Sequence, residues 1–307
     1  MNSESEDFSP SGQDILFQYV IEGKSKAAKR LLISDDTINI DYKDESGNTA
    51  LIYAATYDHF ASAKVLIERG ADVNKKNKCG NTAILFAASQ GNIELVQLLL
   101  QHGAKVDAAN CGGTSALHFA ALGGHLNLVH YLVQGGVVIN RSDCERKTPM
   151  MYAASKGYTA IVSYLIDNGA SVDVQDMRGW TCLFYAVSQS YRLVVQLLTE
   201  RGANVNITDT NGRSALMFCS QCGIALQLIT HGCQVNLKDN HGMTALMYAV
   251  AQGLFDMVML LLAKGADVNA QNEYGETALI IASMRGYESI VALLIRSKTI
   301  DLNMTCE

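Results

Sequence analysis

The chain has 307 residues, of which 49% are apolar and 18% charged, and its formal net charge is −6. This composition is typical of a globular protein and excludes a disordered chain. The acidic balance and the lack of a basic stripe argue against a nucleic-acid partner, and because no stretch of 18 apolar residues occurs, we expect no membrane insertion.

The first residues of the chain are acidic and include Glu4, Glu6 and Asp7. They contain no basic stretch followed by an apolar one, so we expect neither a signal peptide nor a transit peptide. Eight cysteines in 307 residues do not reach the density of a small secreted scaffold. We therefore expect residues 1–12 to form a disordered tail of an intracellular protein, cytoplasmic and also compatible with the nucleus.

A polar helix pair is predicted to follow this tail. Asp14 is the expected N-cap of its first helix, Gly23 the glycine of its turn, and Leu31 and Leu32 the apolar pair of its second helix. Several basic residues make this pair more polar than the later segments, which is what the terminal unit of a repeat array requires.

Internal repeats occupy the rest of the chain. A Thr or Ser followed two residues later by an apolar residue recurs at spacings of 33 residues five times, then 30, then 33. We call these residues the anchors of the repeats. The anchors are Thr49, Thr82, Ser115, Thr148, Thr181, Ser214, Thr244 and Thr277.

Each anchor begins the same local sequence. Its hydroxyl is expected to cap a first helix, and loss of such a cap costs about 1 kcal/mol. A glycine such as Gly91 then ends that helix in a left-handed conformation, and a second helix with a Leu-Leu pair follows. Because one such pair cannot bury its own apolar face, the pattern predicts stacked pairs that each contact only their neighbours.

These segments resemble the ankyrin repeat. Residues 242–249 read G-M-T-A-L-M-Y-A and residues 265–269 read G-A-D-V-N, close to the family pattern. The resemblance implies an all-α solenoid of helix-turn-helix units joined by β-turn or hairpin-like loops. We expect an N-terminal capping unit plus eight repeats over residues 13–303, followed by a C-terminal tail over residues 304–307.

One repeat and one end of the array depart from the pattern. The repeat that begins at Ser214 lacks three residues between Gly223 and Gly232, which predicts a shortened second helix. A local kink of functional value and neutral drift are both open explanations. The last repeat has no polar cap after Asn303. Three explanations are open: the short tail and the outward charges are enough to cover this end, the chain continues in a longer protein, or this end binds a partner.

Nothing in the sequence indicates catalysis, a cofactor or a metal site. Cys219 and Cys222 form a C-x-x-C without a second pair or a redox-type context, and Cys219 stands where other repeats have a small core residue. No Ser-His-Asp or Cys-His arrangement occurs. We therefore expect a protein that is not an enzyme and binds no cofactor.

The fourth residue after the anchor is aromatic in seven repeats. Its rings are expected to form a ladder on the first helices, either as packing between repeats or as the rim of a binding groove. The series is Tyr53, Phe86, Phe119, Tyr152, Tyr185, Phe218 and Tyr248, and then Ile281.

The turns before the anchors are the predicted binding surface. By the family resemblance, a protein partner is bound through these turn tips and the concave face of the adjoining first helices. The tips of the later repeats carry residue types enriched in interfaces. Trp180, the single tryptophan, is expected to be exposed, and either contact with a partner or packing on a neighbouring tip explains it. The predicted partner-binding residues are Met177, Arg178, Trp180, Arg213, His241, Met243 and Tyr274.

The sequence therefore predicts a non-catalytic scaffold or adaptor, monomeric on its own, whose partner it does not identify. The alternative is a regulatory or targeting subunit of an enzyme complex, such as a substrate-recognition or inhibitory subunit. In addition, Asn74 and Asn269 resemble ankyrin asparagines that are hydroxylated. The other interpretation is that these two side chains only stabilise their turns.

Overall fold

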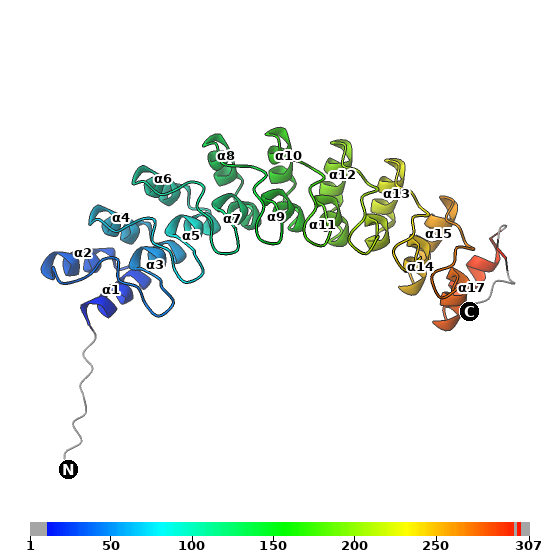
Figure 1. The fold of residues 1–307 in the computed structure, drawn as a ribbon, viewed down its shortest axis with the longest axis horizontal. Coiled ribbons are helices and arrows are strands. Elements are labelled where there is room, and N and C mark those ends of the chain that lie inside the picture. The colour runs from blue at the N-terminus through cyan, green and yellow to red at the C-terminus, as the bar shows by residue number, and fades with distance from the viewer. Residues whose placement is uncertain (1–10, 298–299, 302–307) are drawn as a thin grey trace, which may run out of the picture. The chain divides into compact units, whose positions relative to one another are not determined.

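The computed structural model of the chain describes residues 11–297 and 300–301, and every regular element within them is a helix. The chain divides into two units, residues 1–145 and residues 146–307. In each unit the first helices of the repeats form one row and the second helices another (Figure 1). The predicted all-α architecture is confirmed.

The first unit contains four helix pairs. Helices α3, α5 and α7 pack side by side, and each also packs against the second helix of its own repeat. Fully buried leucines such as Leu66 and Leu99 fill the space between the rows. The helices are α1 (Gly12–Ile21), α2 (Ser25–Ser34), α3 (Ala50–Thr56), α4 (Phe60–Glu68), α5 (Ala83–Gln90), α6 (Ile93–Gln101), α7 (Ala116–Gly123) and α8 (Leu126–Gln134).

The second unit repeats this packing over five helix pairs. Its core includes Leu165, Leu198, Leu228 and Leu261, each at most 1% exposed. The helices are α9 (Pro149–Ser155), α10 (Thr159–Asp167), α11 (Cys182–Ser188), α12 (Arg192–Glu200), the 3₁₀ helix η1 (Ala215–Phe218), α13 (Cys222–Thr230), α14 (Ala245–Ala251), α15 (Phe255–Ala263), α16 (Ala278–Met284) and α17 (Glu288–Ile295).

The loops before the anchors are narrow hairpins. The two sides of the loop pair through isolated β-bridges, as between Thr208 and Ser214 or Lys238 and Thr244. The predicted cap forms at several anchors; for example, the Thr49 hydroxyl accepts from the Ile52 amide at 3.3 Å. It does not form at Thr82 or Ser214, whose buried hydroxyls have no hydrogen-bond partner. These two helices therefore start without that stabilisation.

The N-terminal unit begins differently from the prediction. Ser11, rather than Asp14, is the N-cap of α1, and Asp14 closes a capping box as the third residue of the helix. The helix therefore includes Gly12, which the sequence places in the tail. The rest of the predicted N-terminal tail, residues 1–10, and the C-terminal tail, residues 304–307, lie outside the described residues.

The three-residue deletion shortens the first helix of its repeat, so the prediction of a shortened second helix is wrong. The first helix, η1, is a single 3₁₀ turn of 4 residues, whereas α13 keeps 9 residues like α12 and α15. Gly223 accordingly lies inside α13 and is not a left-handed helix end. The second helix keeps its length because its apolar residues pack against both neighbouring repeats.

Candidate protein-binding surface

Backbone hydrogen bonds join the turn tips of the second unit edge to edge. The amide of Thr210 donates to the carbonyl of Arg178 at 2.9 Å. The amide of Glu273 donates to the carbonyl of His241 at the same distance. The tips between them are joined in the same way. The seven predicted contact residues therefore lie along one row of four tips.

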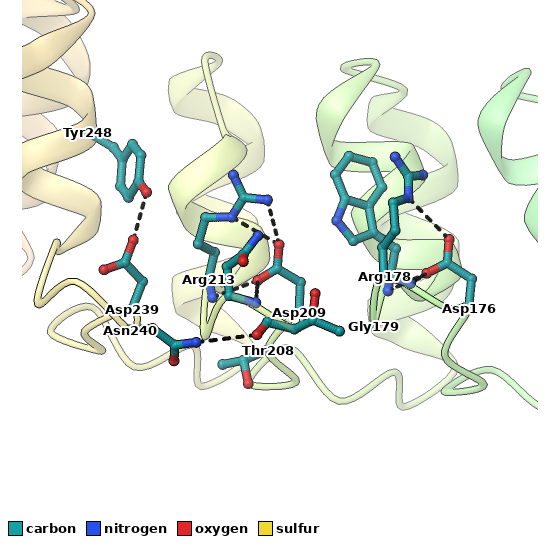
Figure 2. Close-up of polar contacts among 12 residues, drawn as sticks. Asp176, Arg178, Gly179, Thr208, Asp209, Arg213, Asp239, Asn240 and Tyr248 are labelled. Atoms are coloured by element: carbon teal, nitrogen blue, oxygen red, sulfur yellow. Dashed lines mark hydrogen bonds and ion pairs between the residues drawn. The ribbon is translucent and has the colours of Figure 1, made fainter.

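A buried acidic side chain organises the first of these tips. One oxygen of Asp176 accepts from the backbone amides of Arg178 at 2.8 Å and Trp180 at 2.9 Å (Figure 2). The other oxygen accepts from the Tyr185 hydroxyl at 2.7 Å. These hydrogen bonds offset the cost of burying the carboxylate, and they fix the backbone of the tip. The same pair of amide bonds recurs at Asp209 and Asp239.

The donor to the second carboxylate oxygen changes from tip to tip. Asp239 receives the Tyr248 hydroxyl at 2.7 Å (Figure 2). Asp209 instead accepts hydrogen bonds from Nε and Nη2 of Arg213, at 2.9 and 2.7 Å. Phe218 stands where the other two repeats have tyrosine, so no phenol is present to donate. The guanidinium of Arg213 also lies over the Phe218 ring, 4.6 Å from its centroid.

The tyrosines that serve these carboxylates are neutral donors at physiological pH. Burial, together with the hydrogen bond to Asp239, raises the pKa of Tyr248 to about 12. Burial and the hydrogen bond to Asp176 likewise raise the pKa of Tyr185. Both phenols keep their proton and can donate it to the adjacent carboxylate.

Trp180 is half-buried, so the prediction that its side chain is exposed is wrong. Its ring packs on Phe184, Tyr185 and Phe218 at centroid distances of 5.8, 5.3 and 5.2 Å. The guanidinium of Arg178 covers the ring at 4.4 Å. Trp180 thus connects two rings of the aromatic ladder in successive repeats. The sequence left packing of Trp180 on a neighbouring tip open, but it did not indicate that the rings of the ladder are its partners.

Two further predicted contact residues are also held against the fold. The Arg213 side chain is only 28% exposed and is paired with the buried Asp209. Met243 is half-buried, and its sulfur lies 3.4 Å from the side-chain nitrogen Nδ2 of Asn272. Both residues lie on the predicted surface, but their contacts give them a structural role.

Four predicted contact residues are exposed. Met177 is 64% exposed and Tyr274 is 63% exposed. The Arg178 side chain remains largely accessible above Trp180. His241 is exposed and approaches Glu273, with 2.7 Å between Nδ1 and the carboxylate oxygen. The outer surface of the row therefore combines two apolar side chains with charged and polar ones.

The two asparagines predicted as hydroxylation sites bind neighbouring loops. The Asn74 side chain donates to the Gly103 carbonyl at 2.9 Å and accepts from the Lys105 amide at 3.1 Å. The Asn269 side chain accepts from the Asp301 amide at 2.8 Å. These contacts favour the interpretation that the side chains stabilise the turns. Hydroxylation stays a prediction, and intact-mass analysis of protein from native cells tests it through a species heavier by one oxygen atom.

Removing the Asn74 side chain should destabilise the first unit. We expect Asn74→Ala to lower the free energy of unfolding by about 1–2 kcal/mol, because two backbone groups of the next loop lose their partner. Urea denaturation followed by circular dichroism measures the change. Asn74→Asp keeps the acceptor but not the donor, so its loss should be smaller than that of Asn74→Ala, and equal losses would contradict this explanation.

Neither a metal-binding cluster nor an activated buried thiol is found in the described part of the chain. No group of three or more His, Cys, Asp or Glu among the described residues could hold a metal ion. Burial raises the pKa of the Cys219 thiol to about 12 and that of Cys233 to about 11, so neither is a ready nucleophile. Cys219 is 6% exposed, in agreement with its interpretation as a core residue. No helix in the described part of the chain is long and apolar enough to cross a membrane.

Comparisons with known proteins agree with this architecture. No curated protein matches the chain. The crystal structure of the human ASB11 ankyrin repeat domain is similar, with a TM-score of 0.66 and 29% sequence identity over 71% of this chain and 98% of that chain. A family model described as ankyrin repeats in three copies matches residues 1–77, 64–143, 138–209, 194–272 and 216–306.

Proposed function

The chain belongs to the ankyrin-repeat family, and we propose that it is a non-catalytic scaffold or adaptor that recognises a protein partner through its turn tips. Ankyrin repeats are in general protein-binding modules. The observation that carries the proposal is the row of tips in the second unit, where backbone hydrogen bonds hold exposed side chains in register.

The chemistry of this row suits a protein partner. Met177 and Tyr274 supply exposed apolar area, and Arg178 and His241 add polar groups beside them. Aromatic residues, methionine and arginine are enriched in interfaces. The tips are already fixed by buried side chains, which are the carboxylates of Asp176, Asp209 and Asp239 and the amide of Asn272. Binding would therefore order few additional groups and lose little entropy.

The same surface would serve a regulatory or targeting subunit of an enzyme complex, and the identity of the partner separates that role from a simple scaffold. We also propose that the protein is monomeric on its own and intracellular, in the cytoplasm and the nucleus. Light scattering of the purified chain and imaging of a tagged chain test these two points.

The test of this function is partner capture with a variant altered only at exposed tip residues. We expect Met177→Ala combined with Tyr274→Ala to lose the specific partners of the wild-type chain in quantitative affinity purification from native cells. With a purified partner, the double variant should bind at least about tenfold more weakly, since interface anchors commonly contribute more than 1 kcal/mol each.

A matched control alters two other exposed apolar residues, which lie on the second helices, away from the tips. Leu193 on α12 is 68% exposed and Met259 on α15 is 49% exposed. The Leu193→Ala, Met259→Ala variant should keep every partner of the wild-type chain. If the control variant loses the partners and the tip variant keeps them, recognition does not lie on the tips and the proposal fails.

A further inference from the structure

The turn tips of the first unit carry three exposed cysteines, Cys79, Cys111 and Cys144. In this they differ from the buried thiols of the second unit, such as Cys219 and Cys233, whose pKa values are raised by burial. Reaction with oxidants requires an accessible thiol that can ionise. Among the cysteines that the structure describes, the exposed tip cysteines are therefore the thiols most open to oxidation.

Two of these cysteines lie on neighbouring tips in direct backbone contact. The Cys111 amide donates to the Cys79 carbonyl at 2.9 Å. With standard backbone bond lengths, that hydrogen bond places the two Cα atoms no more than about 6.8 Å apart. A disulfide spans Cα distances of about 4.4–6.8 Å, so the pair meets this requirement.

The Cys111 sulfur lies over the turn that contains Cys79. It is 4.0 Å from the Lys78 carbonyl oxygen. A Cβ atom built on Gly80 would lie only 2.8 Å from the same sulfur. The sulfur thus occupies space that a glycine leaves open, immediately beside Cys79, which is itself exposed.

The third cysteine is out of register with the pair. The Cys144 amide donates to the Gly112 carbonyl at 2.8 Å, and Cys144 therefore contacts the residue after Cys111. It shares the exposure of Cys79 and Cys111 but lacks their direct backbone contact with another cysteine among the described bonds. Cys144 is accordingly the natural control for the pair.

We propose that Cys79 and Cys111 are a redox-sensitive dithiol site, which a small disulfide such as oxidised glutathione converts to a disulfide joining two adjacent turn tips. One cysteine thiolate attacks the small disulfide, forming a mixed disulfide and releasing one reduced thiol. The second thiolate attacks the protein sulfur of that mixed disulfide and releases the other. Two protein thiols are oxidised, one small disulfide is reduced to two thiols, and the two protons end on those thiols.

The surroundings of the pair favour an anionic oxidant of this class. Lys76 and Lys78 lie on the same loop as Cys79, whereas a third lysine there, Lys75, is paired with Asp72 at 3.5 Å. Oxidised glutathione carries carboxylates, and a cluster of positive side chains raises the local concentration of such an anion. The attack of the second cysteine is intramolecular, because the two cysteines lie on adjacent turn tips. Formation of the protein disulfide should therefore be fast enough that the mixed disulfide does not accumulate.

The experiment incubates the full chain with oxidised glutathione, blocks the remaining thiols and maps disulfides by mass spectrometry without reduction. We expect a peptide pair linked through Cys79 and Cys111, lighter by two hydrogen atoms than the reduced peptides, which dithiothreitol separates. The Cys144→Ser variant should form the link to the same extent as the wild-type chain, within about twofold.

The single variants Cys79→Ser and Cys111→Ser separate this site from general thiol reactivity. Each should lose the link and instead retain glutathione on the remaining cysteine of the pair, Cys111 or Cys79. Circular dichroism of each variant checks that the exposed substitutions leave the fold intact. If the wild-type chain carries only mixed disulfides, or if it links Cys111 to Cys144 as readily as to Cys79, the proposal is overturned.

Discussion

Replacing Trp180 with alanine should lower the free energy of unfolding of the second unit by about 3 kcal/mol. Truncation of a fully buried aromatic side chain costs about 3–5 kcal/mol, and the partial exposure of Trp180 places it at the low end. The change removes ring contacts to Phe184, Tyr185 and Phe218 and the cation–π contact of Arg178. Urea denaturation of the whole chain, followed by far-ultraviolet circular dichroism, measures the loss.

Two substitutions bracket this effect. Trp180→Phe keeps a ring against Phe218 and should lose about half as much stability, whereas Met177→Ala, at an exposed position on the same tip, should change it by less than about 0.5 kcal/mol. A Trp180→Ala variant as stable as the wild-type chain would show that the ring is a surface group after all. Because instability alone would reduce partner capture, Trp180 is a poor position for a binding test, and Met177 and Tyr274 are better ones.

The sequence predicts the helix pairs well because the repeat spacing places apolar residues on one face of each helix. It does not predict the packing of Trp180, since one of its main contacts is Phe218, in the next repeat. Periodicity reports which face of an element is buried. It does not report which side chain of a neighbouring repeat covers a loop residue, and exposure of a loop is then the default expectation.

The position of the deletion could have been predicted from the sequence. Leu228 lies four residues before Gly232, as Leu261 lies four before Gly265, and Ile224 corresponds in the same way to Met257. The second helix therefore keeps its full apolar pattern when it is counted backward from its final glycine. The missing residues must precede Ile224, which is where the structure shortens the first helix to η1.

A second overlooked signal connects the turn tips with the aromatic ladder. Where the tip has Asp, the residue nine positions later is Tyr, with one exception, and where the tip has Asn, it is Phe or Ile. An amide donates its own hydrogens, whereas the second oxygen of a buried carboxylate requires a donor. The pairs are Asp44–Tyr53, Asn77–Phe86, Asn110–Phe119, Asp143–Tyr152, Asp176–Tyr185, Asp209–Phe218, Asp239–Tyr248 and Asn272–Ile281.

The exception, Asp209 with Phe218, leads to the second prediction. Arg213 supplies the hydrogen bonds that tyrosine supplies elsewhere, so we expect Arg213→Ala to lower the free energy of unfolding by about 2 kcal/mol. Loss of one partner of a buried ion pair costs about 3–5 kcal/mol, and the 28% exposure of the Arg213 side chain lowers that figure. Urea denaturation gives the value for each variant.

A compensating substitution makes this explanation specific. Phe218→Tyr in the Arg213→Ala background places a hydroxyl where Tyr248 has one toward Asp239, and it should restore at least about 1 kcal/mol. In an Asp209→Asn background, Arg213→Ala should cost less than about 1 kcal/mol, because the amide no longer carries a buried charge. If Arg213→Ala is equally costly in both backgrounds, its contribution comes from stacking on Phe218 and not from the carboxylate. Rescue by tyrosine would instead show that each tip is stabilised by satisfying its own buried acid, whichever donor the repeat provides.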